Sequence, residues 1–274
     1  MKHPLLKRGA RGPEVVVLQS LIGAVPDGIF GAQTEALLRI VQRARGLDPD
    51  GKCGPLTWSK LLDEPDAAEQ KGIDLSSYSG LQDFAAHRAS GASFLIVRLT
   101  VGTTNDTLAK VLLQDGQKAG FEQFGAYGYL RGNEPADEQA DALASRTDEV
   151  EAALGIKLAT WIDVEDRNPP SLPWPRELYA ETAIEALARL RKVRKTGTYI
   201  GPWMAALLRK VRDLSPLAEG SLWVSDYSPP VNPIQEWPTW DLWQYRGGDL
   251  DWNLFRGDRS EWERRFLGSP DLPI

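Results

Sequence analysis

The chain has 274 residues, of which 42% are hydrophobic, and carries a formal net charge of −6. This length and composition exclude a disordered chain and provide for one large domain, or for a large domain and a small one. The single cysteine, Cys53, excludes an intrachain disulfide, and two histidines all but exclude a His-based catalytic triad or a zinc site. We therefore expect carboxylates to perform any proton chemistry, with no metal and no other cofactor.

Charge is distributed unevenly along the chain. Residues 1–62 hold nine Lys and Arg against five Asp and Glu, a net charge of +4, so the rest of a chain of net charge −6 carries −10. A basic small domain beside an acidic large one suggests that the small domain meets an anionic polymer. Its basic residues are scattered and no base-binding motif accompanies them, so we expect no nucleic-acid partner.

Targeting signals are missing from the sequence pattern. Residues 1–9 contain no apolar segment long enough for a signal peptide. No stretch approaches the ~20 apolar residues of a membrane span, so we expect no stable membrane association. The expected location is the cytoplasm, unless another component releases the protein.

An internal repeat marks the first 62 residues. Asp27-Gly-Ile-Phe-Gly31 is followed by Thr34, and Asp50-Gly-Lys-Cys-Gly54 is followed by Thr57 and Trp58. Each Asp-Gly pair predicts a turn. Around these turns, the apolar spacing predicts helices over residues 13–22 and 34–43.

Residues 5–62 resemble the peptidoglycan-binding domain type 1, a three-helix wall-binding module. The matching features are Gly9-x-x-Gly12, Val17-Leu18-Gln19, the two Asp-Gly turns, Gly46-Leu47 and Thr57-Trp58, with departures at Val41 and Cys53. The resemblance implies bacterial peptidoglycan as partner, and it implies these wall-binding residues: Asp27, Phe30, Thr34, Asp50 and Trp58. The alternative is a generic three-helix bundle.

Residues 63–71 are polar and acidic and include a proline, so we interpret them as a linker between domains at 1–62 and 72–274. Beyond the linker, strand-like and helical runs alternate. The predicted strands are 72–76, 94–99, 124–129, 158–165, 197–200, 221–227 and 240–245, and the predicted helices lie near 105–119, 136–154, 176–195 and 202–213. This alternation predicts an α/β domain with a mainly parallel sheet, and about 200 residues suit a closed or nearly closed barrel.

The strand over residues 158–165 is the most informative, and residues 166–170 terminate it. Side chains alternate across a strand, so Asp163 and Glu165 share a face, with Cα atoms roughly 6.5–7 Å apart. Two neighbouring carboxyls raise each other's pKa, and glycosidic-bond chemistry requires one protonated and one ionised carboxyl. Taken alone, an Asp-x-Glu is more often a solvated strand end.

Residues at the ends of the other predicted strands favour a catalytic interpretation of Asp163 and Glu165. They are the following acids, aromatic residues and amide: Asp74, Tyr127, Tyr129, Tyr199, Trp223, Tyr227, Trp243, Gln244 and Asp251. Any single aromatic residue here would be interpreted as core packing. As an ordered set on the rim where barrels carry their chemistry, they predict a carbohydrate cleft.

Residues 72–257 resemble the lysozymes of glycoside hydrolase family 25, the N-acetylmuramidases of phages and bacteria. The motifs are Gly72-Ile-Asp74-x-Ser76, Gly125-x-Tyr127, Ile162-Asp-Val-Glu165, Tyr199, Trp223-Val-Ser-Asp-Tyr227, Trp243-Gln-Tyr245 and Asp251-x-Asn253-x-Phe255. The resemblance implies a flattened TIM-like β/α barrel that hydrolyses the β-1,4 bond from N-acetylmuramic acid to N-acetylglucosamine.

The resemblance also implies roles for individual residues. Glu165 would be the general acid and Asp163 its carboxylate partner, with Asp74 and Asp251 lining the cleft. The rim aromatics, Gln244 and Arg98 would bind substrate. Val101 and Gly128 depart from the Glu and His that the family often has at these places. Retaining and inverting routes both remain open.

A wall-binding module on a muramidase without a signal peptide resembles a phage endolysin. We expect a monomer that leaves the host cytoplasm through a separate membrane-permeabilising protein and then acts on the cell wall. Two alternatives stay open. One is a non-catalytic tail or wall adhesin, against which the Asp163/Glu165 pair argues. The other is a chitinase-like glycosidase on the same barrel.

Overall fold

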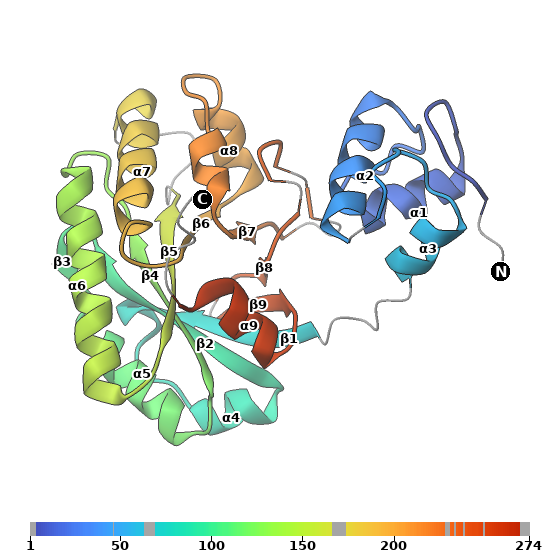
Figure 1. The fold of residues 1–274 in the computed structure, drawn as a ribbon. Coiled ribbons are helices and arrows are strands. Elements are labelled where there is room, and N and C mark those ends of the chain that lie inside the picture. The colour runs from blue at the N-terminus through green and yellow to red at the C-terminus, as the bar shows by residue number, and fades with distance from the viewer. Residues whose placement is uncertain are drawn as a thin grey trace. The chain divides into compact units, whose positions relative to one another are not determined.

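The computed structural model describes residues 4–45, 47–62, 69–165, 174–227, 231–232, 234–237, 239–248 and 250–268. The chain divides into two compact units, residues 1–68 with 228–239, and residues 69–227 with 240–274 (Figure 1). Residues 63–68 of the linker expected at 63–71 lie outside the described residues. Residues 69–71 belong to the first strand instead, because they pair with the strands on both sides.

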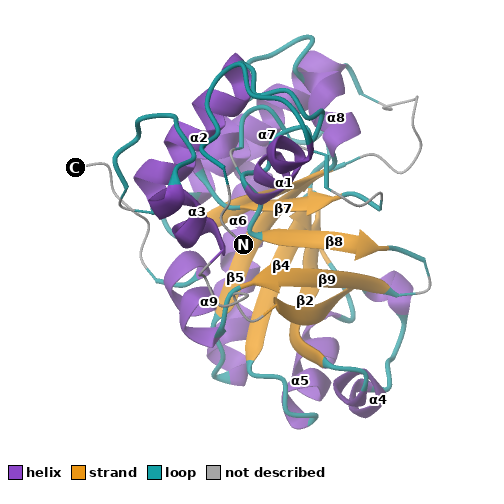
Figure 2. Ribbon diagram, turned by 90° about the vertical axis from the view of Figure 1, so that its right-hand side faces the viewer, coloured by secondary structure: helices purple, strands orange, loops and turns teal. Residues whose placement is uncertain are grey.

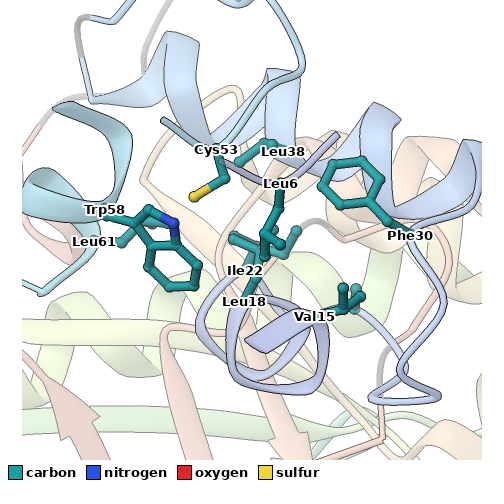
Figure 3. Packing of buried hydrophobic residues seen from close by; sticks show 10 residues of the cluster. Leu6, Val15, Leu18, Ile22, Phe30, Leu38, Cys53, Trp58 and Leu61 are labelled. Carbon is teal, nitrogen blue, oxygen red and sulfur yellow. The ribbon is translucent and has the colours of Figure 1, made fainter. Parts of the chain in front are cut away.

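The first unit is a three-helix module, as predicted. Its helices are α1 Pro13–Leu21, α2 Ala32–Ala44 and α3 Pro55–Leu62. Pro13 opens α1, where its missing N–H costs nothing. The buried core gathers side chains from the helices and from the segments between them, namely Leu6, Val15, Leu18, Ile22, Ala24, Phe30, Leu38, Cys53, Trp58 and Leu61 (Figure 3).

The sequence repeat of this unit corresponds to a repeated polar cluster. Gln19 Nε2 donates to Asp27 Oδ1 at 2.7 Å, and Gln19 Oε1 accepts from the Gly28 N–H at 2.9 Å. Twenty-three residues later, Gln42 Nε2 donates to Asp50 Oδ1 at 2.9 Å and Gln42 Oε1 accepts from the Gly51 N–H at 2.9 Å. Each glutamine also donates to a threonine hydroxyl and a backbone carbonyl. Each Asp-Gly turn is therefore held by the amide of its own buried glutamine.

The second unit contains the strands of the chain's main sheet. They are β1 Glu69–Leu75, β2 Ala92–Val101, β3 Thr104–Asn105, β4 Gln123–Tyr129, β5 Leu158–Val164, β6 Thr196–Ile200, β7 Leu222–Ser225, β8 Leu242–Arg246 and β9 Asp251–Arg256. The helical elements are η1 Ser77–Ser79, α4 Phe84–Ala89, α5 Ala109–Lys118, α6 Ala136–Leu154, α7 Arg176–Leu190, α8 Pro202–Leu208, η2 Ser215–Glu219 and α9 Arg259–Phe266.

Eight of these described strands close a barrel in the order β1-β9-β8-β7-β6-β5-β4-β2, and β2 returns to β1 (Figure 2). The pairs are parallel except at β9, which is antiparallel to both β8 and β1. The predicted α/β barrel is thus confirmed. Six described elements were not predicted, namely β3, β9, α4, α9 and the short helices η1 and η2. The β9 segment has only six residues, and its polar and apolar alternation breaks at the adjacent Leu254 and Phe255, so the sequence predicts a rim motif there and no strand.

The barrel interior is aromatic. Trp161 of β5 lies between two glycines, since a Cβ on Gly125 or Gly197 would come within 2.8 or 2.7 Å of its indole ring. Its ring packs edge-on against Trp223 at 5.7 Å and against Trp262 of α9 at 6.0 Å. Burial of such large side chains is the dominant stabilising contribution of a barrel core.

Strand register then aligns the polar residues near the carboxyl ends of the parallel strands and at the amino end of the antiparallel β9. Asp163 lies opposite Tyr129 of β4 on one side and Tyr199 of β6 on the other. Asp74 of β1 lies opposite Asp251 of β9. Polar side chains from far apart in the sequence therefore meet at this end of the barrel.

The duplicated glutamine clusters give a stability prediction. Replacing Gln42 with Ala leaves the buried Gly51 N–H without its acceptor, so we expect a loss of about 1–3 kcal/mol from the unfolding free energy of the first unit. Gln19→Ala should cost a similar amount. Gln33, which is exposed on α2, is the control. Calorimetric unfolding measures all three variants, and equal melting temperatures for Gln42→Ala and Gln33→Ala would contradict the structural role.

Candidate active site

Two adjoining cavities lie at the carboxyl ends of the strands. The deeper one has a volume of about 110 Å³ and is lined by Asp74, Tyr127, Asp163, Glu165, Tyr199, Trp223, Tyr227, Gln244 and Asp251. The other is an open groove of about 410 Å³, lined by Ser76, Tyr78, Ser79, Arg98, Tyr127, Tyr129, Asp163, Glu165, Gly248, Leu250 and Asp251. Tyr127, Asp163, Glu165 and Asp251 belong to both linings, so three of the four acids lie where the cavities meet.

The four acids predicted from the sequence line the deeper cavity together. Asp163 comes from the end of β5, and Glu165 follows that strand directly. Asp74 and Asp251 come from β1 and β9, the two strands that complete the closed barrel beside β2 and β8. Asp74 and Asp163 are buried, whereas Glu165 and Asp251 are partly exposed.

A chain of hydrogen bonds holds Asp74. Its Oδ2 accepts from Gln244 Nε2 at 2.9 Å and from Asn253 Nδ2 at 2.7 Å. Asn253 is oriented in turn by Trp223, whose indole Nε1–H donates to Asn253 Oδ1 at 2.8 Å. Because an indole N–H can only donate, it fixes which end of the Asn253 amide faces Asp74.

The same chain continues to Glu165. The hydroxyls of Tyr227 and Tyr199 lie 2.8 and 3.0 Å from Gln244 Oε1, and the Tyr199 hydroxyl also lies 3.3 Å from Glu165 Oε2. A tyrosine hydroxyl has one hydrogen. If Tyr199 donates it to Gln244, its oxygen accepts from a protonated Glu165. The arrangement therefore accommodates the acid form of Glu165.

Burial raises the pKa of Asp74 well above its ordinary value, and the nearby Asp251 raises it further, against the lowering effect of the Asn253 and Gln244 amides. Burial also raises the pKa of Asp251. The pKa values of Tyr127 and Tyr199 are raised as well, mainly by burial. Both phenols therefore remain protonated donors at neutral pH.

The backbone at the end of β5 is fixed by two groups that sequence reasoning missed. The buried Tyr179 of α7 donates from its hydroxyl to the Glu165 carbonyl at 2.9 Å. The Leu130 N–H donates to the Asp163 carbonyl at 3.1 Å. Tyr179 lies within an amphipathic helix, where nothing in the sequence separates it from core packing.

Most of the predicted aromatic residues line one of the two cavities, and Trp243 lines neither. Trp223 is buried and packs edge-on against Tyr199 at 4.7 Å and Tyr127 at 5.7 Å, so it lines the deeper cavity as a rigid wall. Tyr129 lines the groove and Tyr227 the deeper cavity. Trp243 lines neither cavity, which differs from the expectation. It alternates with Gln244 on β8, so its side chain lies on the other face, where its Nε1–H donates to the Asp226 carbonyl at 2.6 Å.

Arg98 lines the groove as expected, but its guanidinium is bound within the protein. It is buried and forms an ion pair with the buried Asp106, with Nε and Nη2 at 2.9 and 2.8 Å from Oδ2. Nη2 also donates to Ser77 Oγ at 3.1 Å. The structure thus gives Arg98 a positioning role toward the η1 turn.

The residues expected to bind the wall lie in two kinds of place. Phe30 and Trp58 are buried in the core of the first unit (Figure 3). The buried Thr34 belongs to the polar cluster around Gln19. Asp27 and Asp50 lie at its surface, each with Oδ1 bound by the repeated glutamine. The repeat that made these residues visible in the sequence is a folding signal.

Among the described residues, no group of three or more His, Cys, Asp or Glu side chains is arranged to hold a metal ion. In the same part of the chain, no helix has the length and apolarity required to cross a membrane.

The raised pKa of Asp74 predicts how stability depends on pH. The folded state holds the Asp74 proton more tightly than the unfolded state, so this stabilisation is present in acid and is lost as pH rises above the ordinary value of 3.8 and through the raised folded value. Asp74→Asn keeps an amide oxygen for the two donors and removes this titration. We expect its unfolding free energy, measured by urea titration, to fall less steeply with pH than that of the unmodified chain. Parallel pH profiles would contradict the prediction.

The family comparisons agree with both units. The profile of glycosyl hydrolases family 25 matches residues 73–249, and that of the peptidoglycan binding domain matches residues 12–61. The chain is also 40% identical over 66 residues to an uncharacterized protein from the bpoA1 3′ region of Kitasatospora aureofaciens. That match covers 22% of this chain and 56% of the relative, so the chain spans about half the length of that protein.

Solved structures show the same fold. The muramidase from Acremonium alcalophilum is similar with a TM-score of 0.58 and 22% identity, over 70% of this chain and 96% of that one. The lysozyme from Streptomyces coelicolor gives a TM-score of 0.59 and 22% identity over 72% and 96%. The modular autolysin LytC from Streptococcus pneumoniae, in complex with a synthetic peptidoglycan ligand, gives 0.55 and 16% over 69% and 47%. With the family match across more than half of its length, the chain belongs to glycosyl hydrolase family 25, the lysozyme-type glycoside hydrolases, and it carries a peptidoglycan-binding domain ahead of the barrel.

Proposed function

We propose that the protein binds bacterial peptidoglycan and hydrolyses the β-1,4 bond between N-acetylmuramic acid and N-acetylglucosamine. The observation that carries the proposal is the meeting of Asp163 and Glu165, from the end of one strand, with two further acids and an aromatic wall in one cavity. Membership of family 25 and the peptidoglycan-binding domain support the choice of substrate.

Glu165 acts in this proposal as the general acid. It is partly exposed where the deep cavity and the groove meet, so the oxygen of a bound glycosidic bond can reach it. Tyr199 offers its hydroxyl oxygen at 3.3 Å as the resting partner of the acid proton. The Tyr179 hydroxyl binds the Glu165 backbone carbonyl, and this bond limits the movement of the Glu165 carboxyl.

Asp163 assists the substrate's own nucleophile. The acetamido oxygen of muramic acid attacks the anomeric carbon and closes a five-membered ring, while the leaving oxygen takes the proton of Glu165. Asp163 accepts a hydrogen bond from the acetamido N–H and stabilises the developing positive charge. Water then opens the ring as the Glu165 carboxylate takes the water's proton, so the configuration is retained and the acid is regenerated.

Asp74 and Asp251 set the surroundings of this reaction. A buried Asp74 that keeps its proton adds no second negative charge against Asp163 and Glu165. Its contacts fix Gln244, which in turn holds Tyr199 and Tyr227 in place. The amides and phenols are therefore oriented before the substrate binds.

The N-terminal unit holds the enzyme on an insoluble polymer. A wall-binding domain joined to a wall-cutting barrel raises the local concentration of glycan at the cleft. We propose that the protein is an endolysin of a bacteriophage that acts on the cell wall as a monomer, and that a separate permeabilising protein gives it access to the wall.

The general acid has a direct test. Glu165→Gln keeps the shape of the side chain but has no acid proton, so turnover on purified peptidoglycan should fall at least ~10²-fold. Binding to insoluble wall in a pull-down, and the melting temperature, should stay as in the unmodified chain. The matched control is Glu185→Gln on α7, away from both cavities. Near-normal release of fragments by Glu165→Gln would sink the assignment.

The route through the acetamido group predicts the stereochemistry of the product. Proton NMR of the first-formed reducing end should show the β anomer, because two inversions at the anomeric carbon give retention. Asp163→Asn should lose activity severely, and mass spectrometry should find no glycosyl-enzyme adduct. An initial α anomer would mean inversion, and an adduct would mean a carboxylate nucleophile. Either finding would replace this route with another.

A further inference from the structure

We propose that Tyr78, on the η1 turn after β1, is a stacking platform for the glycan in the open groove and sets the enzyme's affinity for long glycan strands. This inference rests on the proposed function and extends it to a residue outside the acid cluster. Tyr78 lines the groove with Arg98, Tyr129 and Glu165, but it does not line the deeper cavity. It therefore belongs to the part of the groove beyond the reacting bond.

Tyr78 is unusual because it is both exposed and held in place. Its relative exposure is 74%, which is high for a large aromatic residue on a structured turn. The nearby Arg98 guanidinium carbon lies 5.0 Å from the ring centroid. A cation at that distance is attracted to the ring face and limits its rotation, while most of the ring remains accessible.

The turn beneath Tyr78 is fixed by hydrogen bonds from its backbone N–H groups to side chains. Ser76 Oγ accepts from the Tyr78 N–H at 3.3 Å, and Ser79 Oγ accepts from the Ser76 N–H at 3.1 Å, which forms a reciprocal cap. The Ser77 N–H donates to Asp106 Oδ2 at 3.1 Å. A three-residue turn without such contacts would move freely, so these bonds predefine the position of the ring.

The buried Arg98–Asp106 ion pair holds the η1 turn in place. Taking two charges out of water is costly, so such a pair adds little net stability compared with apolar packing. Here both ions reach the η1 turn, Arg98 through Ser77 Oγ and Asp106 through the Ser77 N–H. The pair thus contributes rigidity at the place where Tyr78 projects.

The ligand that fits is a pyranose ring of the glycan strand. One face of a pyranose presents C–H groups, which pack on an aromatic face, while its hydroxyls remain in water. Acids and serines also line the groove, and their oxygens are hydrogen-bond partners for sugar hydroxyls. The stem peptide of the wall is the competing occupant, and the test below separates the two.

The experiment measures kcat and KM of the full chain on purified glycan strands from which the stem peptides have been removed enzymatically. For Tyr78→Ala we expect KM on long strands to rise about three- to tenfold, the effect of losing one aromatic stacking contact, with kcat within twofold. Tyr78→Phe and Tyr78→Trp should restore KM, because both keep a ring. On strands too short to reach the outer groove, all variants should behave alike.

Leu81 provides the matched control. It follows η1 on the same loop and is 73% exposed, yet it lines neither cavity. Leu81→Ala should leave KM, kcat and the melting temperature unchanged, and Tyr78→Ala should leave the melting temperature unchanged.

Four outcomes would overturn the proposal. These are an unchanged KM for Tyr78→Ala, a loss in kcat alone, failure of Phe to rescue, and an effect that appears only on strands that carry peptides. If the unmodified chain itself cleaved no glycan, the proposed function would fail instead, so the two failures are distinguishable.

Discussion

Closure of the barrel through β1 is the constraint on which the site depends. This strand pairs in parallel with β2 on one side and antiparallel with β9 on the other, which turns the sheet into a ring. Asp74, near its end, is bound by Gln244 of β8 and Asn253 of β9. A buried carboxyl without donors is costly, so these bonds fasten three strands at the point where the ring closes. The same contacts that close the barrel also build the cavity.

The direction of each hydrogen bond in the chain follows from groups that can only donate. The Trp223 indole only donates, which orients Asn253, and Asn253 then donates to Asp74. The Gln244 side-chain oxygen accepts from the hydroxyls of Tyr199 and Tyr227, whose raised pKa values keep them protonated. Such a connected network restricts the rotamers that its side chains can adopt. The cavity is therefore preorganised around Glu165.

The N-terminal unit uses its polar residues differently. Its two buried glutamines, 23 residues apart, stabilise two turns and thereby set the geometry of three short helices. Small domains have limited cores, so interior hydrogen bonds that fix loops carry a large share of their stability. Phe30, Thr34 and Trp58, which the sequence repeat makes prominent, lie in the interior of this unit, so a ligand can contact only other residues at its surface.

Local pattern determined a good part of this protein. The alternation of strands and helices, the three-helix module and the Asp163/Glu165 pair are encoded by periodicity, turn residues and spacing along a few neighbouring positions, and each was predictable from the sequence. Other features were decided by partners far away in the chain. Gln244 and Asp74, which share a hydrogen bond, are 170 residues apart, so only the closed barrel shows that Gln244 faces inward and Trp243 does not. The sequence predicts Arg98 as a substrate contact, and only the structure shows that its guanidinium is paired with the buried Asp106 and lies 5.0 Å from the centre of the Tyr78 ring. The sequence by itself determined that Asp163 and Glu165 lie on one face at the end of β5, because strand spacing is local. The tertiary structure alone decided which polar groups are available to a ligand and which hold the fold, because burial and hydrogen-bond partners depend on contacts between distant segments.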